Sequence, residues 1–397
     1  MICMQYPTGP GRSYLTTELA DALMAQGHQV EVLLLDWAGS PGGPEHAQIT
    51  ETGVRVVRCG AHAVTGLGRT VQGASKFLLS GWALAQTARR RMRLEAFDAA
   101  IAWAPLSAVA PLVPLLGKAG IEHRLLFIWD VFPDHHHEIG RIPGGLPLRL
   151  ARALEQRLMD AFTTLFCTLP GNAAYLRRRW RVKPGQSVRV TPIWSDVTPP
   201  PPADRAAVRA QHGLPLDRPI AVFGGQLTEG RGFEQMLAAA EEGQAAGSPL
   251  LYLFVGHGRL APHVRAKALA QPNLAWRPAL ARDEYLQLLC ACDVGLVATV
   301  PGVTSFSIPS KTLDYLRAGL PVAAAVEHGN DYAAILERYG VGRAVPFRDA
   351  SAFRREAEHL ATDPAARARA RQGAPLCLDE VFDVRHAVRA VLEAISA

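Results

Sequence analysis

Strand-like and helix-like segments alternate along this 397-residue chain, stop once at a run of prolines, and then alternate again. The run, four prolines at 199–202, can continue neither a helix nor a central strand. We interpret the surrounding residues 191–204 as the connection between two domains, because a chain of this length exceeds what one hydrophobic core usually supports. Such alternation predicts, in each domain, a parallel sheet covered by helices on both faces.

The first half opens with a βαβ pattern. A short strand at 1–7 leads into a helix at 12–26, in which Leu15, Leu19 and Leu23 share one face and Gly27 marks the end. Further strands are expected at 29–35, 54–59, 99–103, 123–129 and 163–169, and helices at 76–93, 147–160 and 173–180. In the second half, strands are expected at 220–223, 250–255, 274–277, 294–298 and 321–326, with helices beginning at Phe233 and covering 311–317 and 383–395.

Charge and composition narrow the range of partners. The net charge of +6 and the pI of about 9.1 suit anionic ligands such as nucleotides or lipid phosphates. Six scattered cysteines without a CxxC pair favour reduced thiols in a cytosol. The most apolar stretch, 99–116, is interrupted by prolines and is shorter than a bilayer span, and the opening residues 1–7 are too short for a signal sequence.

A phosphate site is indicated at the start of the helix at 311–317. Ser307, Pro309 and Ser310 predict an irregular loop, with Ser310 as the N-cap of a helix that Gly319 ends. Free amide groups and the positive end of the helix dipole suit a diphosphate, and Lys311 lies in the first turn. The alternative is an ordinary capped helix, with Lys311 solvated and the Asp314 carboxylate paired with a neighbour.

Two glycine-bearing turns follow strands in the second half. The turn at 224–232 would let a phosphate approach the backbone at Gly225 and Gln226, while Arg231 supplies a bidentate cation. It is neither a Walker loop nor a GxGxxG fingerprint. Gly256, His257 and Gly258 form a second such turn. The alternative for both is that the glycines serve only tight connections between strand and helix.

Together these turns resemble the successive donor-site motifs of glycosyltransferase family 4. The motifs, in order, are GQLTEGRG at 225–232, FVGHG at 254–258, ACDVGL at 291–296 and PSKTLDYLRAGLPV at 309–322. The first domain is less specific: a loop with Gly9 and Gly11, the stretch 25–30, and IWDVFP at 128–133 are similar to the subgroup that adds sugars to lipid-linked intermediates of bacterial surface polysaccharides.

The resemblance implies a GT-B fold, in which two Rossmann-like domains face each other across a cleft. It implies an acceptor domain at 1–195, a linker at 196–205, a nucleotide-sugar domain at 206–382, and a last helix within 383–397 that packs back on the first domain. Family members of this type retain the anomeric configuration and need no metal and no cofactor. The reaction is described as a same-face transfer in which the leaving diphosphate helps to deprotonate the acceptor.

The resemblance also assigns site residues, with departures from the usual pattern. Where many members hold the diphosphate with an arginine and a lysine, this chain has Gln226 and Arg231, so Lys311 would supply the missing charge. Where many have two glutamates, it has Phe306 and Asp314, of which Asp314 would bind the ribose. The expected donor-binding residues are Gly225, Gln226, Arg231, Gly256, His257, Arg277, Ser307, Ile308, Pro309, Ser310, Lys311 and Asp314.

Residues of the first domain complete the expected site. Asp130 follows a strand whose carboxyl end would face the cleft, and with Arg231 and Lys311 it forms the expected catalytic set. The alternative for Asp130 is a carboxylate that caps the next turn. By analogy with the family's first loop, Gly9, Gly11 and Arg12 would lie beside the acceptor or the donor phosphates. His135 would contact an acceptor phosphate, and the alternative is that it lies in a simple exposed loop.

The histidine run at 135–137 and two arginine clusters need separate interpretations. Adjacent histidines seldom converge on one ion and no second ligand set accompanies them, so no metal site is expected. The arginine clusters at 89–93 and 177–183 lack interleaved aromatics, which argues against nucleic acid. The first cluster ends an amphipathic segment that could lie on an anionic membrane, or could equally close a core-facing helix.

The sequence therefore predicts a retaining, metal-independent glycosyltransferase. It would move a sugar, from a UDP-sugar, to a lipid-linked or glycan acceptor in the synthesis of bacterial cell-surface polysaccharide, in the cytoplasm and in peripheral contact with the inner membrane face. Two alternatives remain open: a nucleotide-sugar epimerase on the same fold, and a catalytically degenerate binding or scaffold subunit marked by Gln226 and Phe306.

Overall fold

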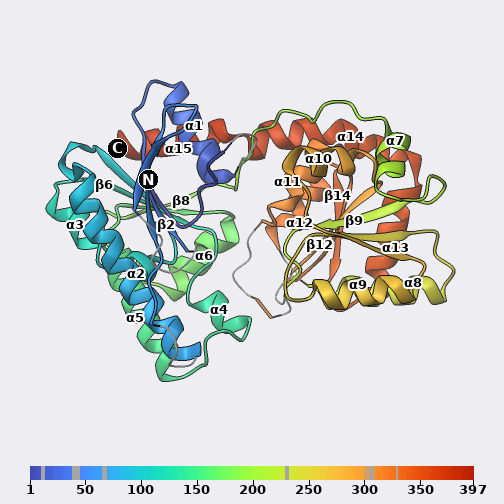
Figure 1. Cartoon of the computed structure of the whole chain (residues 1–397), viewed down its shortest axis with the longest axis horizontal. Coiled ribbons are helices and arrows are strands. Elements are labelled where there is room, and N and C mark those ends of the chain that lie inside the picture. Colours follow the sequence, from blue (N-terminus) through green and yellow to red (C-terminus); the bar gives the residue numbers. More distant parts are fainter. Residues whose placement is uncertain are drawn as a thin grey trace. The chain divides into compact units, whose positions relative to one another are not determined.

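The computed structural model describes residues 1–9, 14–37, 45–64, 69–228, 232–299, 302–303, 308–327 and 330–397, and leaves out the side chains of 69–74. It divides into two compact units (Figure 1). Unit 1 contains Met1–Trp194 and Val384–Ala397, and unit 2 contains residues 195–303 and Ile308–Asp383. Each unit has its own sheet and its own hydrophobic core.

The sheet of unit 1 has the strand order β3-β4-β2-β1-β5-β6-β7-β8. All neighbours pair in parallel except β3, which runs antiparallel to β4 at the edge. The strands are β1 (Ile2–Cys3), β2 (Glu31–Asp36), β3 (His46–Ile49), β4 (Arg55–Gly60), β5 (Ala99–Trp103), β6 (His123–Ile128), β7 (Thr164–Cys167) and β8 (Ser187–Val190). After β1 the chain adds strands on one side of the sheet (β2 to β4) and then on the other side (β5 to β8). The topological switch point therefore lies between β1 and β5.

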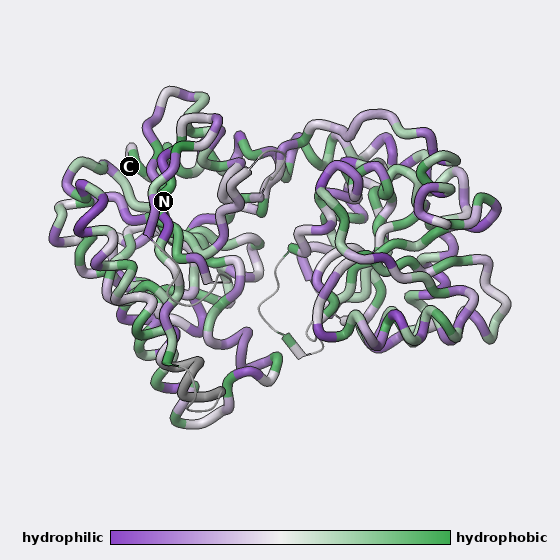
Figure 2. The backbone as a smooth tube through the Cα atoms, viewed as in Figure 1, coloured by the Kyte–Doolittle hydropathy of each residue, from purple (hydrophilic) through white to green (hydrophobic). Residues whose placement is uncertain are grey.

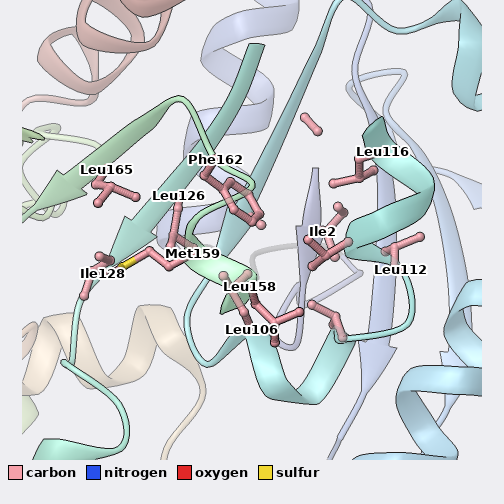
Figure 3. Packing of buried hydrophobic residues seen from close by; sticks show 14 of the residues in the cluster. Ile2, Leu106, Leu112, Leu116, Leu126, Ile128, Leu158, Met159, Phe162 and Leu165 are labelled. Carbon is pink, nitrogen blue, oxygen red and sulfur yellow. The ribbon is translucent and has the colours of Figure 1, made fainter. Parts of the chain in front are cut away.

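Helices cover both faces of this sheet, as right-handed crossovers require. They are α1 (Leu15–Ala25), α2 (Arg69–Arg91), α3 (Val113–Lys118), α4 (Asp134–Glu138), α5 (Leu146–Met159), α6 (Pro170–Arg179) and α15 (Val384–Ile395), with short turns η1 (Leu94–Ala96) and η2 (Leu106–Val109). One core cluster joins α2, η2, α3 and α5 to the strands. Figure 3 shows its centre, where Leu106 and Leu158 lie together and Met159 packs beside Ile128.

Unit 2 repeats the doubly wound pattern with the strand order β11-β10-β9-β12-β13-β14, all parallel. The strands are β9 (Ile220–Gly224), β10 (Leu251–Val255), β11 (Leu274–Arg277), β12 (Val294–Ala298), β13 (Val322–Val326) and β14 (Gly342–Pro346). The central strands are buried along their whole length, and Figure 2 shows their hydrophobic colour within the unit. Continuous burial is typical of parallel strands covered on both faces.

The helices of unit 2 are α7 (Arg205–Gln211), α8 (Phe233–Ala245), α9 (Ala261–Ala270), α10 (Arg282–Cys290), α11 (Lys311–Arg317), α12 (Asp331–Arg338), α13 (Ala350–Thr362) and α14 (Pro364–Cys377), followed by the π-turn η3 (Leu378–Phe382). Helices α8 and α13 pack together over one core cluster, and α11 packs against α14. In Figure 1, α8 and α9 lie on one side of the sheet and α10 and α11 on the other.

The chain passes between the units twice. The first passage falls at Trp194 and Ser195, within the irregular segment that precedes α7, and the Asp204 carboxylate caps α7 by accepting from the amides of Ala206 and Ala207. The second falls at Asp383, after which α15 belongs to unit 1 and packs against α1. The Ser195 amide donates to the Phe382 carbonyl, so the two passages run side by side.

Most of the expected elements are confirmed, and β5 and α11 have the expected bounds. Three strands were missed: β3, β8 and β14. The expectation that Ser310 caps α11 is wrong, because its backbone is already helical (φ −57°, ψ −27°) and its hydroxyl makes no capping bond. Within the ranges that the structure describes, no helix is both long and apolar enough to span a bilayer.

Candidate donor site in the carboxyl-terminal unit

The switch point of the unit 2 sheet lies between β9 and β12, where the connections leave in opposite directions. Three of the expected sites reach this edge: the turn after β9, the turn after β10, and the start of α11. Main-chain hydrogen bonds join the two turns, since the Gly225 amide donates to the Val255 carbonyl at 2.9 Å and the Leu227 amide donates to the His257 carbonyl at 2.7 Å. The turns therefore form one fixed surface.

Glycine is needed in the turn after β10 for space as well as for backbone angle. Gly256 has φ +150°, and a Cβ there would lie 1.8 Å from the Gly225 carbonyl oxygen. Gly258 has φ +142°, and a Cβ would lie 2.4 Å from the Leu227 oxygen. For these two glycines, close packing of the turns is sufficient explanation.

The turn after β9 is open. Gly225 has φ +132°, but no atom of a described residue lies within 4 Å of the position that a Cβ would take. Gln226 beside it is exposed. A ligand could therefore approach this part of the backbone without displacing a side chain.

Lys311 reaches the same edge from the first residue of α11. Its ammonium lies 4.7 Å from the ring centre of Phe223, the buried residue before the end of β9. Ile308, three residues earlier, is 3% exposed and anchors the chain where α11 begins. Pro309 and Ser310 follow it as partly and fully exposed residues. The sheet edge therefore carries a cation held over an aromatic ring.

Asp314, one turn further along α11, is paired with an arginine that the sequence did not suggest. The Arg282 guanidinium, at the start of α10, donates to both carboxylate oxygens, with Nη1 2.7 Å from Oδ2. The carboxylate is 15% exposed and the arginine side chain 28%. The pairing foreseen for Asp314 as an alternative is thus present, and it holds the carboxylate in one orientation.

Two tyrosines support this edge from below. The Tyr315 hydroxyl accepts from the Gly224 amide at 3.3 Å and donates to the Leu296 carbonyl at 3.2 Å, so it ties α11 to the ends of β9 and β12. Its ring lies against Gly295, where a Cβ would be 2.3 Å away. Burial raises the pKa of Tyr285 well above its usual range, and its hydroxyl, which packs on Gly224, has no hydrogen-bond partner in the part of the chain that the structure describes.

The structure ties the Arg277 side chain to main-chain carbonyls. Its guanidinium donates to those of His212, Gly213 and Trp276, and its own carbonyl accepts from the Gly256 amide. Burial lowers the pKa of Arg277. The arginine thus fastens the end of β11 to the loop after α7.

A groove of about 540 Å³ adjoins the turn after β10. It runs from His257, which is exposed, along α9 to Trp276, whose buried indole N–H has no partner among the described residues. The Arg265 guanidinium lies 5.7 Å from the Trp276 ring. Four expected residues, Gly11, Arg12, Arg231 and Ser307, and also Phe306, lie outside the described residues.

In unit 1, three expected residues lie near strand ends. Gly9, with φ +132°, follows β1, and no atom of a described residue lies within 4 Å of where its Cβ would be. Asp130 follows β6, is exposed, and makes no side-chain hydrogen bond with a described residue. The N-cap of the next helix is Pro133, so the Asp130 carboxylate caps no helix. His135 lies in α4, and its buried Nδ1 has no partner within the described ranges.

A buried aspartate fixes α4 and the histidines that it carries. The Asp134 carboxylate accepts from the Tyr175 hydroxyl at 2.8 Å, from the Trp180 indole at 3.2 Å and from Arg152. It therefore joins α4 to α5 and α6. Burial lowers the pKa of the neighbouring His136. Among the described residues, no group of three His, Cys, Asp or Glu side chains is arranged to hold a metal ion.

The chain has two doubly wound units that are joined by two chain passages. The second unit has an exposed turn and a cation at its switch point. Together these features define the class of fold. This is the GT-B fold. The structure is similar to sucrose-phosphate synthase from Thermosynechococcus elongatus, with a TM-score of 0.71 and 18% identity over 96% of this chain and 91% of that one. It is also similar to HepE from Anabaena in complex with UDP and glucose, with a TM-score of 0.70 and 13% identity over 100% and 99% of the two chains.

The first half of the chain is similar to a known family. Residues 11–194 match the glycosyltransferase 4-like domain. The probable glycosyltransferase WbjE of Pseudomonas aeruginosa is 25% identical over 63% of this chain and 64% of its own, so the match spans just under two thirds of that relative. The putative colanic acid biosynthesis glycosyltransferase WcaI of Escherichia coli strain K12 is 26% identical over 79% of this chain and 78% of its own. The first half of the chain thus matches a glycosyltransferase 4-like domain, and the chain is similar to these two bacterial glycosyltransferases.

Proposed function

We propose that the chain transfers a sugar from a UDP-sugar to a lipid-linked or glycan acceptor in the synthesis of bacterial cell-surface polysaccharide. The name of WcaI, with its reference to colanic acid biosynthesis, supports the polysaccharide. The UDP and glucose in the HepE complex support the donor. The reaction would retain the anomeric configuration, need no metal and take place in the cytoplasm.

The observation that carries the proposal is the position of Lys311. Its ammonium lies over the ring of Phe223 near the end of β9, and the turn at Gly225 and Gln226 begins two residues after Phe223. A diphosphate on that turn would accept hydrogen bonds from backbone amides and have its charge balanced by Lys311. As the bond to the sugar breaks, negative charge grows on the diphosphate, so a fixed cation stabilises the transition state more than the ground state.

Asp314 would hold the ribose. A carboxylate offers about four acceptor positions, of which the two hydrogen bonds from Arg282 use two. The remaining positions suit two vicinal hydroxyl groups. In this arrangement Arg282 is a positioning residue, because it orients the carboxylate without touching the nucleotide.

Metal independence rests on the cations that the chain supplies itself. Lys311, together with Arg231, would do the work that a divalent ion performs elsewhere, which is to neutralise the departing diphosphate. In unit 1, the exposed carboxylate of Asp130, which has no side-chain partner among the described residues, would act at the reacting sugar. The acceptor would lie on this unit, beside Gly9 and His135.

Thermal unfolding in the presence of UDP-, GDP-, ADP- and dTDP-sugars tests the donor. A ligand at about 100 times its dissociation constant raises the free energy of unfolding by about 2.7 kcal/mol, so the UDP-sugars should raise the midpoint most. The shift should persist in EDTA. If no nucleotide sugar shifts the midpoint, the proposed donor site is wrong.

Product analysis separates the competing activities. With a UDP-sugar alone, rapid conversion to an epimer would support the epimerase and refute the transferase. Tight UDP binding without turnover on a broad panel of lipid-linked and glycan acceptors would support a binding subunit. Transfer with the anomeric configuration kept, read by nuclear magnetic resonance, is the result that the proposal predicts.

A further inference from the structure

Exposed hydrophobic side chains are concentrated on two helices of unit 1. Among the described residues, twelve large hydrophobic side chains are exposed, and six of them lie on α2 and α5, helices of 23 and 14 residues. They are Leu78, Leu79 and Trp82 on α2, and Leu146, Leu150 and Leu154 on α5. Single exposed leucines are ordinary, but a cluster of this kind marks an interaction surface.

On α5 the exposed leucines form a stripe that adjoins the core face. Leu146 and Leu150 are 67% and 62% exposed, and Leu154 follows at the same spacing. Residues four apart are rotated by about 40°, so the three cover an arc of about 80°. The core face of the same helix carries Leu158 and Met159, which are buried. Folding of unit 1 therefore does not require these three exposed side chains to be hydrophobic.

Helix α2 repeats this arrangement. Leu78 is 71% and Trp82 61% exposed, whereas Leu84 and Ala88 on the other side are fully buried. Tryptophan is enriched at membrane–water interfaces, because its ring is apolar and its N–H is polar.

The turn η2 contacts both helices. Gly81 of α2 packs so close to η2 that a Cβ would lie 2.9 Å from the Ala108 oxygen. From α5, the Glu155 carboxylate accepts hydrogen bonds from the amides of Leu106 and Ser107. Both helices cover the same face of the sheet (Figure 1), and Figure 2 shows hydrophobic and hydrophilic residues mixed along them. The two exposed faces belong to one rigid part of unit 1.

The charged residues of these two helices are almost all basic. Together they carry eight basic residues and one acidic residue, and two of the arginines pair with carboxylates outside these helices, Arg90 with Glu45 and Arg152 with Asp134. The acidic residue is Glu155, which is buried. The exposed face of α5 places Arg149 and Arg157 beside the leucines, and α2 ends with three consecutive arginines. A basic surface with protruding apolar side chains is complementary to anionic lipid.

We propose that the exposed faces of α2 and α5 dock unit 1 on an anionic lipid bilayer, with the six hydrophobic side chains entering the interface and the arginines facing lipid phosphates. This deepens the proposed function, since it names the surface through which the enzyme meets a membrane that holds a lipid-linked acceptor. A second copy of the chain is disfavoured as occupant, because two surfaces of the same strong charge repel.

Co-sedimentation with vesicles tests the docking surface. The chain should bind vesicles of phosphatidylglycerol and phosphatidylethanolamine, bind phosphatidylcholine vesicles far less, and lose binding as salt rises from about 0.1 M to about 0.5 M. The double variant Leu150→Glu/Leu154→Glu should weaken binding at least about tenfold. Arg149→Gln/Arg157→Gln should weaken it while leaving the apolar stripe intact.

The matched control is Leu216→Glu/Leu376→Glu, which changes two exposed leucines of unit 2 and should bind like the wild type. Thermal unfolding checks that every variant folds. Wild-type binding by both α5 variants, or equal binding to both vesicle types, would overturn the docking surface. A dimer in sedimentation equilibrium that the leucine variant abolishes would assign the surface to a second copy instead.

The same variants separate this inference from the proposed function. If the wild type shows the UDP-sugar thermal shift but no vesicle binding, the docking surface is wrong and the donor site stands. If vesicle binding behaves as expected but no nucleotide sugar shifts the unfolding midpoint, the docking surface stands and the proposed donor site is wrong.

Discussion

Replacing Glu155 by glutamine should change how the stability of unit 1 depends on pH. The side chain is 4% exposed and accepts hydrogen bonds from two amides of η2. Burial, which outweighs these hydrogen bonds, raises the pKa of Glu155 from 4.5 to about 7. The group therefore keeps its proton in the folded chain over a pH range in which the unfolded chain has lost it.

The direction and size of the effect follow from this difference. Between pH 4.5 and about 7 the unfolded state binds fewer protons, so the wild type loses stability as pH rises. A shift of about 2.5 pKa units, at about 1.4 kcal/mol each, gives a loss of about 3 kcal/mol that is complete by about pH 8. Glutamine has no such proton to lose, so Glu155→Gln should gain about 3 kcal/mol relative to the wild type over this range.

Urea unfolding of the two proteins at a series of pH values, read by tryptophan fluorescence, measures this. Six of the seven tryptophans lie in unit 1, so the signal reports the unit that contains Glu155. The exposed Glu122 gives a matched control, and Glu122→Gln should follow the wild type at every pH. A difference between Glu155→Gln and the wild type that stays constant across pH would show that the buried carboxyl does not titrate as described.

Three further substitutions test the donor site and its supports. Gly256→Ala should destabilise the chain by at least about 2 kcal/mol in urea unfolding, because its Cβ would overlap the Gly225 carbonyl oxygen; unchanged stability would show that the turns can separate. Arg282→Gln should weaken UDP binding about tenfold by calorimetry, since the Asp314 carboxylate loses its bidentate partner; unchanged affinity would remove Arg282 as a positioning residue. Asp134→Asn should lower the free energy of unfolding by about 2 to 4 kcal/mol, since three donors share that carboxylate; a smaller loss would mean that water replaces it.

Local sequence patterns predicted the interior of both sheets well. Strands such as β5 and β12 are continuous apolar runs that end at prolines or polar turns, and the parallel sheets found here need this pattern. The missed strands lie at or near sheet edges. β3, β8 and β14 alternate weakly and are mostly exposed or half-buried, so their pairing depends on a neighbouring strand and leaves little trace in their own residues.

The residues of the candidate site that lie in local sequence motifs could be predicted. The residues whose role depends on a partner far away in the chain could not. The glycines after β9 and β10 and the lysine that begins α11 are local signals. Arg282 lies 32 residues before its partner Asp314, and no local pattern at the start of α10 distinguishes it from a solvated arginine. The hydrogen bonds from Arg277 to the loop after α7 also join residues that are far apart in the chain, so no local pattern predicts them.

Calorimetric titration of UDP into the wild type and Lys311→Ala tests the proposed donor site most directly. Lys267, the other lysine of unit 2, pairs with Glu241 on its surface and supplies the control Lys267→Ala. Saturable binding of UDP, weakened at least about tenfold by Lys311→Ala and unchanged by Lys267→Ala, is the predicted result. Equal affinity of all three proteins for UDP, or no binding by any, would contradict a diphosphate site at the end of β9.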